Sequence, residues 1–162
     1  MAHFGLCPVD PTTVNDENPK ATPGGLYTYL HATHGLWVLR YVQLKDAVTY
    51  VAGHVLTFAA AALNAATNDI SGGSSIGAIV AGVGLRVYTQ NYYGFILASG
   101  RYPTIVTSGA DDIVIGERLF VHASTDGACD GVVASTTSSG DFGIALVDDI
   151  NADNTVDGIV RG

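Results

Sequence analysis

The sequence predicts an all-β fold, a small antiparallel β-barrel or β-tulip-like domain with an extended N-terminal arm. The 162 residues include 20 glycines, and 48% of the chain is hydrophobic while only 14% is charged, a composition typical of a globular protein rich in turns. Short apolar runs separated by Gly, Asn, Asp and Ser recur along the chain, as strands and turns do. Helical character is confined to residues 58–68, and no apolar run reaches the roughly 18 residues of a membrane helix.

The predicted strands follow one another closely. They cover residues 26–32, 36–44, 47–53, 54–60, 77–88, 91–103, 104–109, 112–124 and 140–150. Because side chains alternate between the two faces of a strand, Trp37, Leu39 and Tyr41 are expected on one buried face. Such a series of short strands is typical of a sandwich or barrel.

The stretch "NYYGFILASGRYP", residues 91–103, is rich in aromatic residues. Alternation places Tyr93, Phe95 and Leu97 on one face and Ile96 on the other, and Ser99-Gly100 suits a hairpin turn because glycine accepts a positive φ. A platform that stacks on sugars or bases needs several rings on one exposed face. The stretch is therefore interpreted as a wall of the domain.

A faint internal repeat supports a two-fold pseudo-repeat. Residues 52–65 resemble residues 115–128, with Gly53 aligned to Gly116. Gly82 aligns with Gly143 at nearly the same spacing along the chain. The alternative is coincidence, because Gly, Ala and Leu are common residues.

Residues 1–24 differ from the rest and are predicted to be an extended arm that precedes a β-domain of residues 25–162. The arm holds four of the five prolines and carries Phe4, Leu6 and Val9 near its tip. These apolar side chains favour contact with a partner surface, whereas a disordered tail is the alternative. The N-terminus shows neither the basic flank nor the long apolar region of a signal peptide.

The charge is unevenly distributed. Of the net charge of −8, residues 101–162 carry −7, from ten acidic residues and three arginines. An acidic surface repels phosphate backbones, so we expect no nucleic-acid partner, and we expect no membrane partner either. Two cysteines, Cys7 and Cys129, form no disulfide framework.

One calcium-loop candidate lies near the C-terminus. Asp149, Asn151, Asp153 and Asp157 occupy alternate positions, as in a calcium-binding loop. The sixth position is Asn154 instead of glycine and the twelfth is Val160 instead of a bidentate acid, so a solvated turn is the favoured interpretation.

Two further candidates for chemistry are weaker. His31 and His34 would share a metal on a helix, but in a strand end and turn their imidazoles should diverge, and no third ligand is evident. Cys129 with His122 upstream would need an orienting third group to become a nucleophile. We therefore expect no cofactor, no metal and no catalytic residues.

The order of several motifs resembles the capsid decoration, or cement, proteins of tailed phages. The resemblance covers about residues 36–148 and rests on these segments: Arg40-Tyr41-Val42, Gly53 to Leu56, Gly82-Val83, Tyr93 to Leu97, Gly116 to Leu119, and Phe142 to Ala145. It implies an all-β protein on the outside of an icosahedral head, often a trimer.

The expected function is therefore structural: the chain binds the outer capsid surface and bridges neighbouring capsomers. The expected partners are the major capsid protein and the chain itself, as a homotrimer, on the virion exterior after assembly in the host cytoplasm. Expected capsid or subunit contacts are Phe4, Leu6, Val9, Trp37, Tyr92 and Tyr102; mainly core or subunit-interface residues are Trp37, Tyr41, Phe95, Ile96, Leu119 and Phe120. The alternatives are a head-fibre, adhesion or carbohydrate-binding module that uses Tyr92 or Tyr102, and a metal-dependent enzyme that uses His31, His34 or Cys129.

Overall fold

The described part of the chain consists of strands, turns and loops without a helix, which confirms the all-β prediction. The computed structural model describes residues 4–45, 49–59, 62–69, 79–109, 112–122, 124–132, 141–148 and 154–161. Its strands are β1 (Phe4–Leu6), β2 (Leu26–His31), β3 (Gly35–Leu44), β4 (Val55–Phe58), β5 (Ala65–Thr67), β6 (Val80–Gly84), β7 (Tyr93–Val106), β8 (Arg118–Val121), β9 (Cys129–Val132), β10 (Asp141–Ala145) and β11 (Thr155–Val160).

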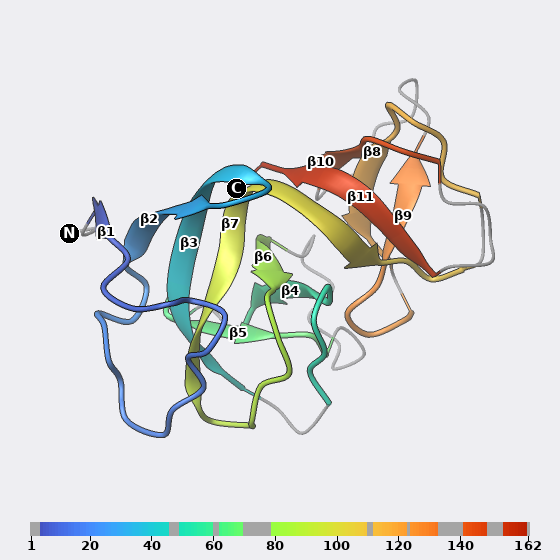
Figure 1. Ribbon diagram of the computed structural model, residues 1–162. Coiled ribbons are helices and arrows are strands. Elements are labelled where there is room, and N and C mark those ends of the chain that lie inside the picture. Colours follow the sequence, from blue (N-terminus) through green and yellow to red (C-terminus); the bar gives the residue numbers. More distant parts are fainter. Residues whose placement is uncertain are drawn as a thin grey trace.

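These strands form one 11-stranded sheet in the order β1-β2-β3-β5-β4-β6-β7-β11-β10-β8-β9, with a further pairing of β3 with β7 (Figure 1). Most neighbours are antiparallel, but β1 with β2 and β3 with β5 are parallel pairs. The prediction of a purely antiparallel domain is therefore wrong at these two places. Strands β1 and β5 have only three residues each. A long connection separates each from its parallel partner, as parallel pairing requires: residues 7–25 between β1 and β2, and a stretch that includes β4 between β3 and β5.

The first half of the sheet closes on itself. β3 pairs with β5, β5 with β4, β4 with β6, β6 with β7, and β7 returns to β3. A buried cluster collects one side chain or more from each of these strands together with two loop tyrosines: Val42, Leu44, Tyr50, Leu56, Ala66, Ala81, Tyr88 and Ile96. The Tyr88 hydroxyl is satisfied there, because it donates to the Phe95 carbonyl and accepts from the Leu85 N–H at 3.1 Å.

The second half follows the same path. The C-terminal part of β7 pairs with β11, and β10, β8 and β9 follow. A parallel bridge joins Cys129 of β9 to Thr107, the residue that follows β7. It corresponds to the parallel pair of Gln43 in β3 and Ala65 in β5 in the first half. Thr107 follows Gln43 at the same spacing along the chain as Cys129 follows Ala65.

The aligned glycines also occupy matching registers. Gly82 lies opposite Leu56, and Gly143 lies opposite Leu119. Gly53 and Gly116 both have a positive φ, of 88° and 86°. These correspondences lie at positions that the predicted internal repeat aligns, and the repeat itself stays a prediction.

Strand β7 joins the two halves, and here the predicted hairpin is wrong. β7 runs without interruption from Tyr93 to Val106, and Gly100 pairs with Val160 within the ladder. The strand continues because its first half has β3 and β6 as partners and its second half has β11, and these pairings outweigh the local turn preference of Ser99-Gly100. The predicted faces are confirmed, since Phe95 and Leu97 belong to the larger core cluster and Ile96 to the smaller one.

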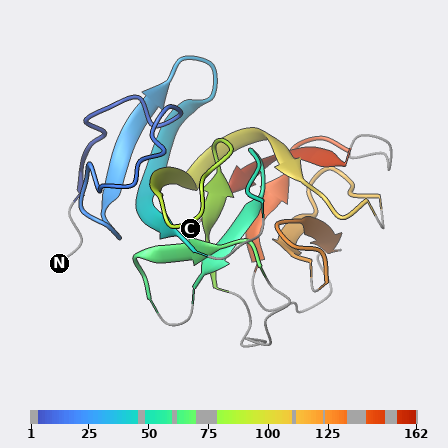
Figure 2. The ribbon, with the colours of Figure 1, turned by 90° about the horizontal axis from the view of Figure 1, so that it is seen from below.

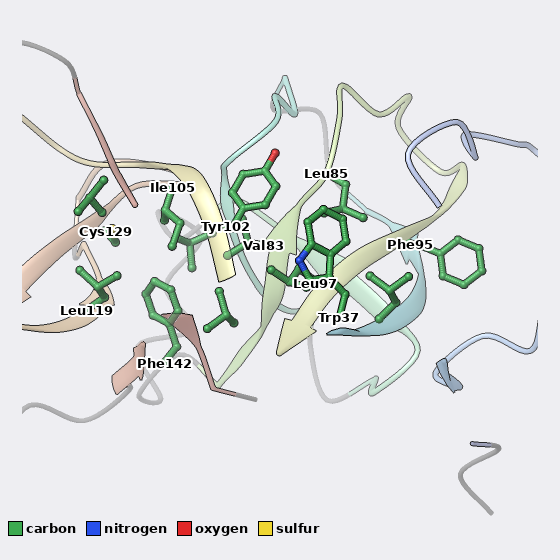
Figure 3. Packing of buried hydrophobic residues seen from close by; sticks show 14 of the residues in the cluster. Trp37, Val83, Leu85, Phe95, Leu97, Tyr102, Ile105, Leu119, Cys129 and Phe142 are labelled. Carbon is green, nitrogen blue, oxygen red and sulfur yellow. The ribbon is translucent and has the colours of Figure 1, made fainter. Parts of the chain in front are cut away.

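The larger core cluster spans both halves of the sheet. Figure 3 shows it running from Cys129, Leu119 and Phe142 through Tyr102 and Val83 to Trp37 and Phe95. Trp37, Leu39 and Tyr41 all belong to it, which confirms their predicted common face. A continuous core of this kind couples the halves, so they should unfold together.

Other expectations about local structure differ from the fold at several places. In predicted strand 47–53 the described residues 49–53 are irregular, and Tyr50 is buried in the smaller cluster. The helical candidate 58–68 begins with the last residue of β4, as the expectation of a strand at its beginning allows, and then contains β5. The sequence missed β11, whose Asp157 and Gly158 obscure its alternation. Phe120, predicted as a core or subunit-interface residue, is half-buried, and its interface role stays a prediction.

The described part of the N-terminal segment lies against the sheet. β1 pairs with β2, Val14 is buried in the larger cluster, and Asp16 bridges to Tyr93. The Lys20 N–H donates to the Tyr41 hydroxyl at 2.8 Å, and the Arg86 guanidinium donates to the carbonyls of Thr12 and Thr13. The boundary between arm and domain at residue 24 stays a prediction.

The two aligned turn glycines provide a matched test of packing. A Cβ at Gly53 would lie 2.0 Å from the Thr104 carbonyl oxygen of β7, whereas a Cβ at Gly116 would meet no atom within 4 Å. Because the φ values are nearly equal, Gly116→Ala should cost about 1–2 kcal/mol for the left-handed backbone alone. Gly53→Ala should cost at least about 1–3 kcal/mol more, since the backbone must also shift. Urea unfolding of both variants measures the difference, and equal losses would contradict this packing.

Candidate contact surfaces

Six of the exposed large hydrophobic side chains of the described residues form two groups, and the others, which belong to neither group, are Val9, Leu63, Ile79, Val87 and Ile159. The first group lies on the outer side of β1, β2 and β3, where Leu6, Leu30 and Leu36 are 84%, 76% and 62% exposed. Leu30 and Leu36 are direct cross-strand partners, and Leu6 is the partner of Thr28, which lies on the same side of β2 as Leu30. We call these three residues the leucine face.

The leucine face departs from the usual pattern of an antiparallel sheet. The opposite side of the same strands already supplies core residues, namely Tyr27, Trp37 and Leu39. A sheet with one side on the core normally turns polar residues to solvent on the other. Here both sides are apolar, and contiguous exposed apolar surface marks an interaction site.

The leucine face also lacks charge. The only charged residue in β1, β2 and β3 is Arg40. Its guanidinium donates to the Ala81 carbonyl at 2.8 Å and lies 4.8 Å from the centre of the Phe58 ring. Arg40 is therefore engaged in the first half of the sheet.

The second apolar surface is formed by Val114, Ile115 and Val147, which we call the C-terminal patch; all three are exposed. Val114 and Ile115 begin a tight turn in which the Glu117 N–H donates to the Val114 carbonyl at 3.0 Å. The Gly116 N–H donates to the Ala145 carbonyl at 2.9 Å, and the Ile115 N–H to Oδ1 of Asp148 at 2.6 Å. Residues 145–148 thus hold the turn in place through the Ala145 carbonyl and the Asp148 carboxylate.

The two surfaces differ in position and in charge. β1 and β2 lie at one end of the molecule and β8 and β9 at the other, in both views (Figures 1 and 2). The C-terminal patch belongs to the acidic half and has the exposed carboxylates of Asp112 and Asp148 as close neighbours in the chain. The leucine face belongs to the half of the chain that is nearly neutral.

The histidine pair lies at the tip of the β2–β3 hairpin, and its predicted divergence is wrong. The His31 and His34 rings stack with their centres 4.6 Å apart, and His31 stacks on Trp37 at 4.3 Å. They converge because Nδ1 of His31 accepts the backbone N–H groups of Thr33 and His34, which folds the turn back. Among the described residues, no three His, Cys, Asp or Glu side chains gather as metal ligands.

A second polar cluster, which the sequence did not indicate, surrounds Asp130. Its carboxylate accepts a hydrogen bond from Ser108, and its Oδ2 lies 3.4 Å from Nε2 of His122. Nδ1 of His122 accepts from the Ser124 N–H at 3.3 Å, so Nε2 carries the proton when the ring is neutral. The serine bonds to the acid, whereas an activated serine bonds to a histidine base. The cluster therefore connects Asp130 of β9 to the segments that follow β7 and β8, beside buried Cys129.

The predicted contact residues fall into two groups. Leu6 and Val9 are exposed, whereas Trp37 and Tyr102 are 2% and 8% exposed and pack on each other in the core. Tyr92 is half-buried, and the side chain of Phe4 lies outside the described residues. A contact role for all six stays a prediction. Sequence reasoning missed Leu30 and Leu36. The available signal was their position on either side of the hairpin turn, in register with each other and out of phase with buried Trp37.

The calcium candidate is largely outside the described residues, because Asp149, Asn151 and Asp153 are not among them. Asp157 is described and lies in β11, where Nε of Arg101 donates to its Oδ1 at 3.1 Å. This carboxylate is therefore part of an ion pair between β11 and β7.

Comparisons with known proteins give a distant structural likeness. No protein-family model and no curated protein matches the chain. A solved structure, the N base of the head fiber gp8.5 of bacteriophage phi29, is similar with 13% identity and a TM-score of 0.49, covering 76% of this chain and 92% of that chain. The described residues also contain no helix that is long and apolar enough to cross a membrane.

The turn at the tip of the β2–β3 hairpin, which contains His31, should lose stability in mild acid. Burial, and next the neighbouring His34, lower the pKa of His31, while Asp10 raises it by a smaller amount. The unfolded chain therefore binds the proton more readily than the folded one. This contribution to stability is complete above the ordinary pKa near 6.5 and is lost as the pH falls from that value through the lower pKa of the folded state. Protonation also removes the Nδ1 acceptor of the turn.

We expect His31→Asn to reduce the fall in Tm between neutral pH and pH 5, because an Asn side-chain oxygen can accept the same backbone N–H groups but does not titrate. Thermal unfolding monitored by circular dichroism at a series of pH values measures this. An unchanged pH dependence in the variant would show that His31 does not contribute.

Proposed function

We propose that this chain is a structural protein of a bacteriophage head, which binds the outer capsid surface and stabilises it by bridging neighbouring capsomers without catalysing a reaction. The observation that carries the proposal is the pair of exposed apolar surfaces at opposite ends of one sheet. Its partners are the major capsid protein and further copies of the chain, as a homotrimer, and its location is the exterior of the virion.

Two separated surfaces on one body make the chain bivalent. Fully burying one leucine or valine side chain is worth roughly 1.5–3 kcal/mol, so three such residues at either end give a contact of modest strength. Contacts of this kind become strong when many copies engage a lattice together, because each additional contact is made at a high effective concentration.

The framework between the surfaces suits this role. The larger core cluster spans both halves, and β7 passes from one to the other without a break. The turn of the C-terminal patch is fixed by backbone hydrogen bonds before any partner binds. A rigid contact loses little conformational entropy on binding.

The resemblance to capsid decoration proteins supports the proposal, and it concerns the strands and the core of the molecule. Its motifs lie in or next to β3, β4, β6, β7, β8 and β10, and its apolar members Leu56, Phe95, Leu119 and Phe142 are buried. The motifs therefore describe the inner scaffold. Leu30, Leu36 and Val147 lie outside those motifs, so they would adapt this chain to its own partners.

The polar groups of the described residues also favour a structural role. His31, His34, His122 and Asp130 are engaged in turns and strand contacts, as described above. A carbohydrate platform on the aromatic stretch is less favoured, because Tyr102 and Phe95 face the core. We propose that no cofactor and no nucleic acid take part.

We further propose that the sheet arose from two tandem units. The first comprises β3 to β7 and the second begins within β7 and ends with β11. The equivalent parallel bridges and the paired glycines support this division. β7 then belongs to both units, which explains its length of 14 residues.

The capsid proposal is tested by adding purified chain to heads of the encoding phage that lack it, followed by sedimentation and electron microscopy. We expect the chain to sediment with the heads and to add density on their outer surface. Absence of binding to the heads would contradict the proposed function.

A matched pair of variants tests the C-terminal patch. Ile115→Asp introduces a charge at a residue that is 61% exposed and should weaken binding to heads at least about tenfold, the equivalent of about 1.4 kcal/mol. Val87→Asp makes the same kind of change at a residue that is 58% exposed and belongs to neither surface. It should bind as the unmodified chain does. Equal behaviour of the two variants would exclude the C-terminal patch as the capsid contact.

A further inference from the structure

We propose that the leucine face is the subunit contact, and that its occupant is the leucine face of a second copy of this chain. This inference assigns one of the two surfaces of the bridging protein and rests on that proposed function for its biological meaning. The contact itself is a property of the purified chain and is measured without a capsid.

The shape of the surface suits packing of one sheet on another. Leu30 and Leu36 are direct cross-strand partners in β2 and β3. Leu6 of β1 is the partner of Thr28, the neighbour of Leu30 on the same side of β2. Thr28 and half-buried Val38, which are also cross-strand partners, complete the same side of the strands. Two such sides can approach face to face with their side chains interdigitated, as in a β-sandwich.

Edge-to-edge pairing is a poorer use of this region. β1 is the outermost strand, but it has only three residues. A short edge offers few backbone hydrogen bonds to a new strand. The apolar side chains above β1 and β2 therefore provide the larger part of the contact.

The charge distribution points to a copy of the same chain as the occupant. Residues 1–100 carry a net charge of −1, the difference between −8 for the chain and −7 for residues 101–162. Contact through the acidic halves of two chains would bring carboxylates together. Contact through the leucine faces joins the neutral halves and leaves the acidic halves at the far ends.

The chemistry of the face narrows the choice further. A partner with a charged surface would lose hydration against three leucines and find no charged residue in β1 or β2 to pair with. The partner must therefore present apolar, uncharged side chains. The chain's own leucine face has that character, and it is the surface present at equal concentration in every preparation.

A face-to-face contact between two identical faces has a twofold axis, because residue i of one copy meets residue j of the other and residue j meets residue i. In a trimer the three leucine faces would instead meet around the threefold axis, each copy contacting its two neighbours through different edges of the face. Both arrangements place the C-terminal patches on the periphery, where they remain available to another partner.

The test is sedimentation velocity of the purified chain over a range of concentrations, with the variants Leu36→Lys, Leu36→Glu and Ile115→Asp. We expect the unmodified chain and Ile115→Asp to associate equally. Each Leu36 variant should associate at least tenfold more weakly, because a charge would be buried in the contact. Circular dichroism should remain unchanged, since the position is exposed.

Mixing the two Leu36 variants distinguishes face-to-face contact from an indirect effect. If the faces pack on each other, Lys and Glu from different copies come together, and the equimolar mixture should recover association. A monomeric unmodified chain would overturn the inference. So would association that Ile115→Asp abolishes, or a mixture that stays dissociated.

The outcomes for this inference and for the proposed function are separable. A chain that self-associates through Leu36 but does not bind heads would keep this inference and refute the capsid function. A chain that binds heads but remains monomeric in solution, with Leu36→Lys bound normally, would do the reverse.

Discussion

The continuity of β7 is the constraint on which the rest of the structure depends. Its first half is hydrogen-bonded to β3 and β6, and its second half to β11. Gly100, with φ at 132°, lies where the partners change, and a Cβ there would lie 2.8 Å from Cδ1 of Trp37. Glycine lets the strand pass close to the indole while its ladder continues. A turn at this point would have separated the two halves of the sheet.

Because β7 is continuous, the two halves share one core and hold their outer surfaces at a fixed separation. Trp37 connects them directly: its indole N–H donates to the Arg101 carbonyl at 2.9 Å, and its ring packs on Tyr102. The same indole supports the stacked His31 and His34 at the hairpin tip. Trp37 thus contacts both the hairpin tip beside the leucine face and the second half of the molecule.

Much of the framework could be predicted from sequence because it depends on local alternation. The strand at residues 35–44 and the buried face of Trp37, Leu39 and Tyr41 follow directly from that pattern. The hairpin at Ser99-Gly100 failed because turn preference is a local signal, whereas β3 and β11, the ladder partners of β7, are distant in sequence. The prediction that His31 and His34 diverge failed for a related reason. Their convergence depends on two backbone hydrogen bonds to one imidazole nitrogen. The leucine face was missed because outward leucines are recognised only when the inner side of the same strands is known.

The proposed structural role depends on the separation of the two surfaces. The polar clusters described at His31 and Asp130 serve a turn and the contact of β9 with the segments that follow β7 and β8. The apolar side chains of the leucine face and the C-terminal patch lie at the ends of the molecule, on a hydrogen-bonded ladder and a fixed turn. Keeping those side chains exposed costs solubility, and the net charge of −8 offsets that cost by repulsion between free chains. The negative charge is concentrated in the C-terminal half, so repulsion between two copies of the chain is weakest at the neutral end, where the proposed contact between leucine faces lies.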